Sequence, residues 1–505
     1  MTLPRRPAFI PHVIDGAEVE SLDGGRFDNV NPWTRQPEAE VALGTPADAD
    51  RAIDAARRAF DDGPWPRMGF AERGKLLHRL ADLIDGRADE LAQADTTDMG
   101  KPIDDMRTKE VPRSAYNLRF FADHARLSTG DVYPMDSGHH AYALFQPAGV
   151  VAAISPWNFP LMLETWKVAP ALAWGNTVVL KPAEDTPASA TLLARLALEA
   201  GLPPGVLNVV HGFGPNAPGQ ALTESAKVDR ITFTGASDTG RIISRAASTN
   251  LVPCSLELGG KGANIVFADA DLDHAVDWSI KAIFSNAGQV CLAGSRLYVE
   301  RPIYDAFVER FVARAEALRI GDPMEPGTQV GPLASLEHFK KVSSYLETLE
   351  GGDGRVVTGG IGDGWVVRPT VVVNVDTKSP VYREEIFGPV VVVLPFASEA
   401  EAVALANDTR YGLNAMLFTR DLSRAHRVAA GLRAGTVWVN CFFIRDLRAP
   451  FGGAGESGVG REGGNFSREF FTEPKAVVME VAAAPAADAT EPLQGHTVRL
   501  GRRTI

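Results

Sequence analysis

The sequence predicts an α/β protein with two α/β domains, and three observations support this prediction. Between residues 150 and 267, short apolar runs alternate with longer helix-like segments, a pattern typical of a parallel sheet whose strands are connected by helices. A second alternating block follows, from residue 269 to about residue 464. With 505 residues and a mass of 54.1 kDa, the chain is also too long for a single compact core. Two such domains would leave a cleft between them.

Helices are expected first along the chain. From Asp48 to Phe60, apolar residues recur at helical spacing, and the same period continues from Leu76 to Leu91. We expect these helices to cover the first sheet.

The first block contains strand candidates at residues 150–154, 177–180, 206–210, 231–233 and 263–267. One helix between them is well delimited, because Thr186 can cap its start, Pro187 suits its first position and Gly201 follows its last apolar residues. The second block contains strand candidates at residues 370–375, 390–396 and 436–440. Residues 482–492 are rich in Ala and Pro and predict a surface tail, after which residues 497–500 could add an edge strand.

The composition excludes several classes of protein. A formal net charge of -12 and a pI near 5.4 argue against a nucleic-acid partner and favour a small soluble ligand. The chain has neither a long uncharged apolar run nor an apolar segment behind its N-terminal arginines, so we expect a cytoplasmic protein with no membrane partner. The three cysteines, Cys254, Cys291 and Cys441, do not suggest a disulfide framework. The histidines show no ligand spacing, so no metal site is expected.

Two polar segments follow predicted strands of the first block. The run from Ser155 to Pro160 ends one strand and can open a helix, where Asn158 is placed to donate a hydrogen bond to developing negative charge. The alternative is an asparagine in an ordinary turn. After the next strand, Lys181 and Glu184 could bind the ribose hydroxyls of a nucleotide, or they could form a solvated surface pair.

Glycines also follow strands of this block. Gly212 and Gly214, and Gly235 with Gly240 beyond it, would allow the backbone to approach a pyrophosphate closely. They do not form the Gly-x-Gly-x-x-Gly dinucleotide fingerprint, and glycine after a strand is often only a turn.

A carboxylate and a thiol are the candidate reactive pair. Glu257 stands just before Gly259-Gly260, an arrangement that can project a carboxylate into a cleft for base catalysis, although a surface glutamate beside a turn has the same pattern. Cys291 closes the polar, glycine-containing segment Ser285-Asn286-Ala287-Gly288-Gln289-Val290 and is the candidate nucleophile. The alternative for Cys291 is an inert buried thiol, which we expect for the other two cysteines.

Together, five motifs resemble those of the aldehyde dehydrogenase superfamily. They are Ser-Pro-Trp-Asn at 155–158, Glu-Leu-Gly-Gly-Lys at 257–261, Gly-Gln-Val-Cys at 288–291, Glu-Glu-Ile-Phe-Gly-Pro at 384–389 and Pro-Phe-Gly-Gly at 450–453. Their order and spacing cover about residues 10 to 480. The resemblance implies Cys291 as nucleophile, Glu257 as general base and Asn158 in the oxyanion hole with the backbone N–H of Cys291. It implies a cofactor site lined by Ile154, Ser155, Pro156, Trp157, Lys181, Ala183, Glu184, Gly214, Thr234, Gly235, Ala236, Leu258, Glu385 and Phe387.

The chemistry that the resemblance implies is oxidation of an aldehyde to a carboxylic acid through a cysteine thiohemiacetal and thioester. Glu184 near the adenosine ribose would accept hydroxyl hydrogen bonds and repel a 2′-phosphate, so NAD is expected rather than NADP. Two positions depart from the family pattern without touching these residues: Ala454-Gly455 replaces a segment with lysine, and Gly262-Ala263 replaces a polar residue and proline.

Within the superfamily, the segments 111–122, 439–448 and 460–464 are similar to those of the 2-aminomuconate and 2-hydroxymuconate semialdehyde dehydrogenases, including the 5-carboxymethyl-2-hydroxymuconate branch. Such aldehydes carry a carboxylate at the far end, and a guanidinium group matches a carboxylate. Arg113 and Arg445 are the candidates for substrate binding; Arg119 or Arg448 could take either place, and an ordinary structural ion pair is the alternative.

The resemblance also implies the domain organisation. We expect an NAD-binding, Rossmann-like domain at residues 1–126 and 143–257, a catalytic α/β domain at 258–464, a small β oligomerisation arm at 127–142 and 465–481, and a C-terminal tail at 482–505. A homodimer or homotetramer is expected. Two other functions stay open: the same chemistry on a neutral aromatic or aliphatic aldehyde, and a dehydrogenase-derived binding protein without turnover.

Overall fold

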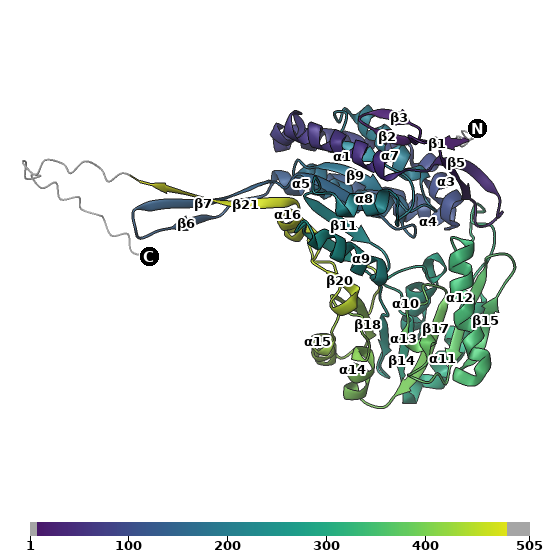
Figure 1. Cartoon of the computed structure of the whole chain (residues 1–505). Helices are drawn as coiled ribbons and strands as arrows, with labels where there is room; N and C mark the ends of the chain where they lie inside the picture. Colours follow the sequence, from purple (N-terminus) through teal and green to yellow (C-terminus); the bar gives the residue numbers. More distant parts are fainter. Residues whose placement is uncertain (1–7, 482–505) are drawn as a thin grey trace, which may run out of the picture. The chain divides into compact units, whose positions relative to one another are not determined.

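The computed structural model describes residues 8–481, so the predicted tail at 482–492 and the edge strand at 497–500 lie outside the described residues. The described chain divides into two compact units (Figure 1). The first comprises residues 8–127 and 147–472, and the second comprises residues 128–146 and 473–481. Both large sheets belong to the first unit.

The first large sheet has eight strands, of which the five central ones are parallel. In spatial order the strands are β20 (Gly458–Val459), β12 (Cys254–Glu257), β11 (Arg230–Thr234), β8 (Val150–Ile154), β9 (Thr177–Lys181), β10 (Leu207–Val209), β2 (His12–Ile14) and β3 (Ala17–Val19). The predicted strands at 150–154, 177–180, 206–210 and 231–233 are confirmed as β8 to β11. The short antiparallel strands β2, β3 and β20 have no apolar run in the sequence that would have announced them.

Helices cover both faces of this sheet because successive side chains of a buried strand point to opposite faces. Val151 and Val178 pack in one core, and Val150 and Val179 pack in the other. The first core also holds α2 (Phe70–Gly86), α3 (Ala88–Met99), α5 (Val111–Arg126), α6 (Pro160–Ala173) and α7 (Ala188–Ala200). The second holds α1 (Pro46–Asp61), α8 (Pro218–Glu224) and α9 (Ser237–Ser248). The predicted helical covering is therefore confirmed, with α4 (Ile103–Asp105) and the π turn η2 (Met106–Glu110) between α3 and α5.

The ends of α7 test the predicted caps. Gly201 ends the helix in the left-handed conformation with φ +99°, as its sequence position predicts. The predicted cap by Thr186 is wrong, because the carboxylate of Asp98 on α3 accepts the hydrogen bond from the N–H of Ala188 at 3.1 Å. A residue distant in sequence thus supplies the acceptor that the helix start needs.

The second large sheet has seven strands, all parallel except β15. They are β15 (Arg355–Ile361), β16 (Val367–Val373), β17 (Val390–Phe396), β14 (Arg296–Glu300), β13 (Ala263–Val266), β18 (Asn414–Phe418) and β19 (Thr436–Val439). Helices α10 (Leu272–Phe284) and α11 (Tyr304–Glu316) pack on one face, and α12 (Leu336–Thr348), α13 (Pro380–Arg383), α14 (Glu399–Asn407) and α15 (Leu422–Gly431) pack on the other. The strand at 263–267, which its pattern groups with the first block, lies at the centre of this second sheet, so that grouping was wrong.

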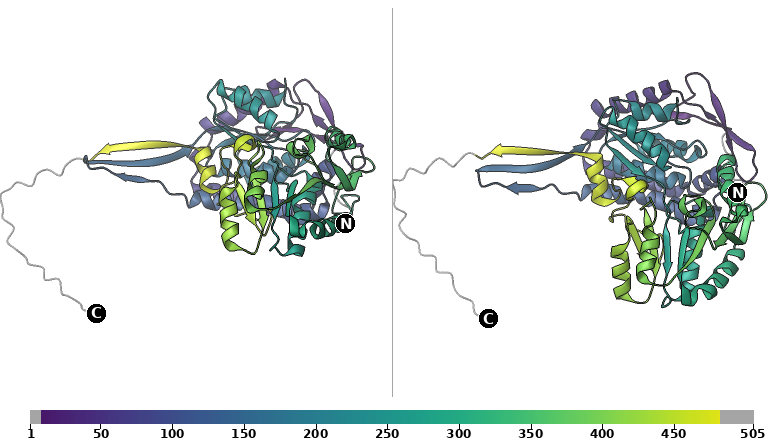
Figure 2. Two further views of the ribbon diagram at one scale, coloured as in Figure 1. Left: turned by 90° about the horizontal axis from the view of Figure 1, so that it is seen from below. Right: turned by 60° about the horizontal axis from the view of Figure 1, so that its bottom comes forward.

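Two small sheets complete the described chain. One consists of β1 (Phe9–Ile10), β5 (Pro37–Ala42) and β4 (Arg26–Val30), and the other of β21 (Thr472–Glu480), β7 (His139–Pro147) and β6 (Val132–Pro134). The second small sheet is a narrow ribbon in both views of Figure 2. Its strand β21 follows α16 (Gly464–Phe471). The domain boundaries expected from the sequence stay a prediction. Short turns lie between the longer elements: η1 (Trp65–Arg67), η3 (Ser285–Gly288), η4 (Arg301–Ile303), η5 (Leu349–Asp353) and η6 (Gly455–Ser457).

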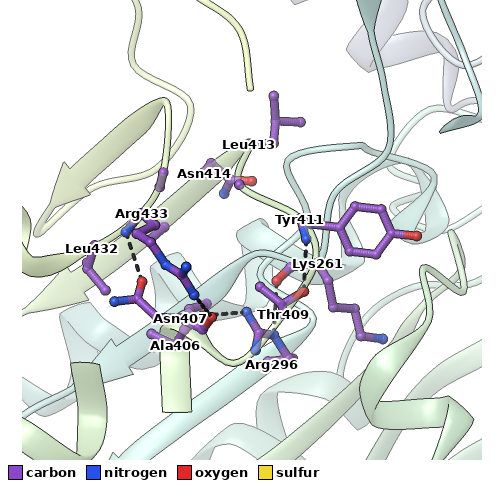
Figure 3. A pocket seen from close by; sticks show the side chains of 14 residues that line it. Lys261, Arg296, Ala406, Asn407, Thr409, Tyr411, Leu413, Asn414, Leu432 and Arg433 are labelled. Carbon is purple, nitrogen blue, oxygen red and sulfur yellow. Dashed lines mark hydrogen bonds between the residues drawn. The ribbon is translucent and has the colours of Figure 1, made fainter. Parts of the chain in front are cut away.

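A small pocket beside β18 is structural (Figure 3). Its buried Arg296 donates hydrogen bonds to the carbonyl oxygens of Lys261 at 3.0 Å and of Ala406 at 2.9 Å. A guanidinium group at this end of α14 satisfies carbonyls that have no partner within the helix. The pocket encloses about 10 Å³, which is room for no more than a water molecule, so it is not a ligand site.

Candidate active site

The loops after four parallel strands of the eight-stranded sheet meet at one cavity of about 340 Å³. Trp157 follows β8, Glu184 follows β9, Gly235 follows β11 and Leu258 follows β12. From β8 the chain continues to β9 and β10 on one side, and β11 and β12 lie on the other. The strand order therefore reverses between β8 and β11, which is where open α/β sheets bind nucleotides.

The cavity collects most of the residues that the sequence singled out. Those lining it are Pro156, Trp157, Asn158, Glu184, Thr234, Gly235, Ala236, Leu258, Cys291, Glu385 and Phe387. The remaining predicted cofactor residues, Ile154, Ser155, Lys181, Ala183 and Gly214, are not among its lining, and their role stays a prediction. Residues that sequence reasoning missed are Asp185, Gly259, Ser335, Glu337, His338 and Lys341. Four of these, Ser335, Glu337, His338 and Lys341, lie at or just before the start of α12, more than 40 residues from the nearest motif, so no local signal marked them.

Gly259 and Gly260 explain how the 257–261 motif packs at the wall of the cavity. A Cβ on Gly259 would collide with the carboxylate of Glu385, and a Cβ on Gly260 would collide with the carbonyl oxygen of Cys291. The backbone N–H of Gly260 also donates a hydrogen bond to Oε1 of Glu385 at 2.8 Å. At position 260 the obstacle is backbone, so glycine is required there for the 257–261 and 288–291 motifs to meet. At position 259 a larger residue would have to displace the carboxylate of Glu385.

The loop before Cys291 has an unusual backbone. Asn286, Ala287 and Gly288 have consecutive positive φ angles of +52°, +51° and +71°. Such angles are costly for residues with a side chain and occur where surrounding structure enforces them, often at functional sites. A Cβ on Gly288 would collide with the backbone of Gly388, so this loop packs directly on the 384–389 motif.

Asn158 is bound to this same loop. Its side-chain amide donates a hydrogen bond to the backbone carbonyl oxygen of Gln289 at 2.9 Å. The backbone carbonyl oxygen of Asn158 accepts one from the side-chain amide of Asn286, also at 2.9 Å. A primary amide has two N–H groups, so one remains for a group in the cavity. Asn158 and Cys291 therefore lie on one cavity wall, held by hydrogen bonds between their loops.

The Cys291 thiol is half-buried, and Glu257 is almost fully buried. Burial raises the pKa of Cys291 to about 12, and the negative charges of Glu385 and Glu257 add to this rise. Burial, followed by the charge of Glu462, also holds the pKa of Glu257 well above its usual range. Both carboxyl oxygens of Glu257 are buried and make no hydrogen bond within the described chain. A carboxyl group with this environment holds its proton more tightly than an exposed glutamate does, which suits a group that must take up a proton.

Glu462 forms a buried network behind Glu257 that sequence reasoning missed. Its carboxylate accepts hydrogen bonds from Lys167 Nζ at 3.3 Å, from Thr232 Oγ1 at 3.3 Å and from the indole N–H of Trp166. Lys167 is fully buried, and its positive charge lowers the pKa of Glu257. The negative charge of Glu462 raises the same pKa. The partners of Glu462 lie about 230 to 300 residues away in the chain, so only the fold brings them together.

The two predicted substrate arginines lie close to each other and to Cys291. The guanidinium carbon of Arg445 lies 4.8 Å from the ring centre of Trp166, and that of Arg113 lies 5.9 Å from the same ring. Burial lowers the pKa of Arg445 to about 10, and the charge of Arg113 contributes to this shift. The charge of Arg445 in turn lowers the pKa of Cys291. Within residues 8–481, neither arginine forms an ion pair, and Nη2 of Arg445 is buried without a hydrogen-bond partner.

Three rings line the cavity beside Glu385. Trp157 lies 4.9 Å from His338 and 5.3 Å from Phe387, measured between ring centres. Nε2 of His338 forms a hydrogen bond with the carbonyl oxygen of Phe387 at 2.8 Å, and Phe387 has a positive φ of +62°. Burial lowers the pKa of His338 to about 4, so its ring is neutral and Nε2 is the donor.

Glu184, Asp185 and Glu337 also line the cavity. Glu184 is half-exposed and lies 3.8 Å from Nζ of buried Lys181, which also donates to the carbonyl oxygen of Pro182 at 2.9 Å. Burial raises the pKa of the neighbouring Asp185 to about 7, and the charges of Glu184 and Glu337 add to the rise. A carboxylate at a strand end, flat rings and glycine backbone in one cavity fit the ribose, the bases and the pyrophosphate of a dinucleotide.

Two searches of the described residues bear on other classes of site. No group of three or more His, Cys, Asp or Glu side chains in this part of the chain could hold a metal ion. Among the same residues, no helix is both long and apolar enough to cross a membrane.

Known proteins match nearly the whole chain. Residues 19–477 match the Aldehyde dehydrogenase family. The 2-hydroxymuconic semialdehyde dehydrogenase of Pseudomonas sp. (strain CF600) is 48% identical over 485 residues, covering 94% of this chain and 99% of its own. The 2-aminomuconic 6-semialdehyde dehydrogenase of a Pseudomonas species is 46% identical, covering 93% and 97%. Among solved structures, that of PnpE in complex with nicotinamide adenine dinucleotide superimposes with a TM-score of 0.92 at 44% identity, covering 95% and 100%.

The chain therefore belongs to the aldehyde dehydrogenase family, whose members oxidise aldehydes with a nicotinamide cofactor and a cysteine nucleophile. It is an enzyme, and the predicted α/β fold with a Rossmann-like sheet is confirmed.

Proposed function

We propose that this enzyme oxidises a muconate-type semialdehyde, an aldehyde with a carboxylate at its far end, to the corresponding acid with NAD. The observation that carries the proposal is the pair Arg113 and Arg445, two guanidinium groups close to each other near Cys291 with no carboxylate partner in the described chain. The names of the two Pseudomonas relatives, both semialdehyde dehydrogenases, agree with it.

Electrostatics favour an anionic ligand between these arginines. Two like charges in a partly buried site repel each other, and the repulsion is relieved when a carboxylate binds both. The rings of Trp166 and Phe451 hold the Arg445 guanidinium, at 4.8 and 3.7 Å from its carbon, which leaves its N–H groups free to donate. Arg119 and Arg448, the other two candidates, are already paired with Asp82 and Asp446. Arg113 and Arg445 are thus the better candidates for binding the carboxylate of the substrate.

In this proposal Cys291 is the nucleophile. After its thiol has lost its proton to solvent, the sulfur adds to the aldehyde carbon and the C=O π bond opens; the resulting oxyanion accepts hydrogen bonds from Asn158 and from the backbone N–H of Cys291. A nicotinamide bound in this site would accept the hydride that the thiohemiacetal carbon loses, which is the two-electron oxidation that gives the thioester. The ring-lined part of the cavity beside Glu385, next to Cys291, would hold it.

Glu257 is the proposed general base for the second half of the reaction. Its buried carboxylate would take a proton from water as the water attacks the thioester, which releases the acid product and restores the thiol. The high pKa of Glu257 favours this uptake of a proton. Lys167 and Glu462 adjust that pKa from behind, with opposite signs.

NAD is proposed as the cofactor rather than NADP. Glu184, Asp185 and Glu337 place three carboxyl groups at the same end of the cavity, where a 2′-phosphate would meet repulsion. The expected outcome is a kcat/KM with NAD well above that with NADP, measured by the absorbance of the reduced cofactor. A Glu184→Gln variant should narrow the difference.

The decisive experiment compares a muconate-type semialdehyde with a neutral aromatic aldehyde. Arg445→Ala should lower kcat/KM for the semialdehyde by about 100-fold, the scale of a lost hydrogen-bonded ion pair in a buried site, and change that for the neutral aldehyde much less. Arg448→Ala, an exposed arginine paired with Asp446, is the matched control and should change neither. Equal losses for both aldehydes in Arg445→Ala would contradict the proposal, as would no turnover of the semialdehyde by the unaltered enzyme.

We further propose that the sheet of β6, β7 and β21 mediates a homodimer or homotetramer. Its strands expose large apolar side chains, among them Val132, Tyr133, Leu144, Val478 and Met479. A sheet of so few strands with exposed apolar residues gains stability when it is covered. Light scattering after size-exclusion chromatography should give a mass of two or four chains, and Val478→Asp should reduce it. An unaltered enzyme that is monomeric at micromolar concentration would contradict this.

A further inference from the structure

A second cavity, also of about 340 Å³, lies against the one described above. Asn158 and Cys291 line the first cavity, while their chain neighbours Phe159 and Val290 line the second. Both cavities thus border the same two short stretches of chain, which carry the nucleophile and the oxyanion donor. A ligand in the second cavity would therefore lie beside the loop that carries Cys291.

The charges in this second cavity do not cancel. Lys101 lies 2.7 Å from the carboxylate of Glu110, and Lys109 lies 2.5 Å from that of Asp105. Both carboxylates line the cavity as well. Lys281 is the remaining lysine in its lining, and it forms no ion pair within residues 8–481. One exposed positive charge is therefore left over beside the path to Cys291.

One aromatic ring contacts this lysine, and others line the cavity. Nζ of Lys281 lies 4.6 Å from the ring centre of Trp278, one turn earlier on α10. Phe159, Phe442 and Phe443 provide further flat walls. A planar conjugated molecule fits between such rings, and a carboxylate on it would be attracted by the ammonium group of Lys281.

We propose that Lys281 is a specificity-determining residue, which selects aldehydes with an anionic far end as they approach Cys291 through this second cavity. This inference rests on the proposed function, but it concerns a different cation from Arg445. The arginines bind the carboxylate once the aldehyde has reached Cys291, whereas Lys281 favours its passage. Because Lys281 is exposed, its attraction for an approaching anion weakens as the salt concentration rises.

The test uses two aldehydes of the same shape and different charge, 4-carboxybenzaldehyde and its methyl ester. The measured quantity is the ratio of their kcat/KM values in the full-length enzyme with NAD, at low salt and at about 0.5 M salt, where screening is strong. Lys281→Glu should lower the acid-to-ester ratio about tenfold at low salt, the scale of reversing one charge near the substrate path, and much less at high salt. Lys281→Arg, which keeps the charge, should retain the ratio.

Two controls separate this inference from a structural role and from the proposed function. Lys340→Glu makes the same change of charge at an exposed residue of α12 that lines neither cavity, and it should leave the ratio unchanged. If Lys281 only stabilised the end of α10, its variants would lower the thermal midpoint and affect both aldehydes alike. An unchanged ratio in Lys281→Glu together with a lowered ratio in Arg445→Ala would overturn the role of Lys281 alone. An unchanged ratio in both variants would overturn both proposals.

Discussion

The carboxylate of Glu257 lies against the backbone of Gly452. A Cβ on Gly452 would stand 2.6 Å from Oε1 of Glu257, and this glycine also has a positive φ of +147°. The Pro-Phe-Gly-Gly motif thus leaves room for the proposed base. A carboxyl group with neither oxygen hydrogen-bonded depends on such packing for its position.

Gly452→Ala should therefore displace Glu257. A displacement of about 1 Å at a reacting group costs on the order of 100-fold in rate, so kcat should fall by that factor. Steady-state kinetics and a thermal melt measure the effect on rate and on stability. Gly24→Ala, at another glycine with positive φ but with nothing within 4 Å of its Cβ, is the control and should retain activity. Retained kcat in Gly452→Ala would contradict the predicted contact.

The pH dependence of kcat should report Glu257. Its pKa lies well above the usual range, so the carboxyl group is protonated at low pH and the rate rises as pH rises through that pKa. Glu462→Gln removes a negative charge that raises this pKa, and the rising limb should therefore move to lower pH. Glu469→Gln on the exposed side of α16 should leave the profile in place. A limb that stays fixed, or moves to higher pH, in Glu462→Gln argues against the coupling.

The thiol of Cys291 should react slowly with alkylating agents in the enzyme without cofactor. Its pKa of about 12 means that the thiolate fraction, and with it the rate, rises about tenfold per pH unit from pH 7 to pH 10. Iodoacetamide labelling in a Cys254→Ser, Cys441→Ser background measures this rate at a single site. Free cysteine, with a pKa of about 8.5, provides the comparison because its rate levels off within that range. A plateau for Cys291 near pH 8 is the contrary result.

His338 should affect binding of the cofactor rather than the chemical step. His338→Ala removes the hydrogen bond to the Phe387 carbonyl and the ring contact with Trp157, so the KM for NAD should rise about threefold to tenfold. His338→Gln keeps a donor and should recover part of the loss. His274, whose Nε2 bonds the carbonyl oxygen of Asn440 at 2.8 Å outside the cavity, is the matched control. An unchanged KM for NAD would exclude His338 from the cofactor site.

Local pattern was enough for most of the regular structure. Apolar runs located β8, β9 and β17, and helical spacing located α1, because these segments are buried in the way their periodicity requires. Pattern failed where a segment depends on distant neighbours. The start of α7 is capped from α3, and β13 pairs with β14 and β18 rather than with the strands before it.

For the candidate site too, the sequence identified some residues, and only the structure identified the others. The motifs around Asn158, Glu257 and Cys291 were recognisable as linear patterns, since each combines a reactive side chain with turn residues that have specific backbone needs. His338, Lys167 and Glu462 were not, because each is an ordinary residue within a helix or loop and gains its role from a partner far away in the chain. Lys281 gains its role from the cavity that it lines. The reactive residue types of the site could therefore be recognised from the sequence alone. Which charges remain without a partner, and which pKa values shift, was decided only when the fold set the burial and the neighbours of each group.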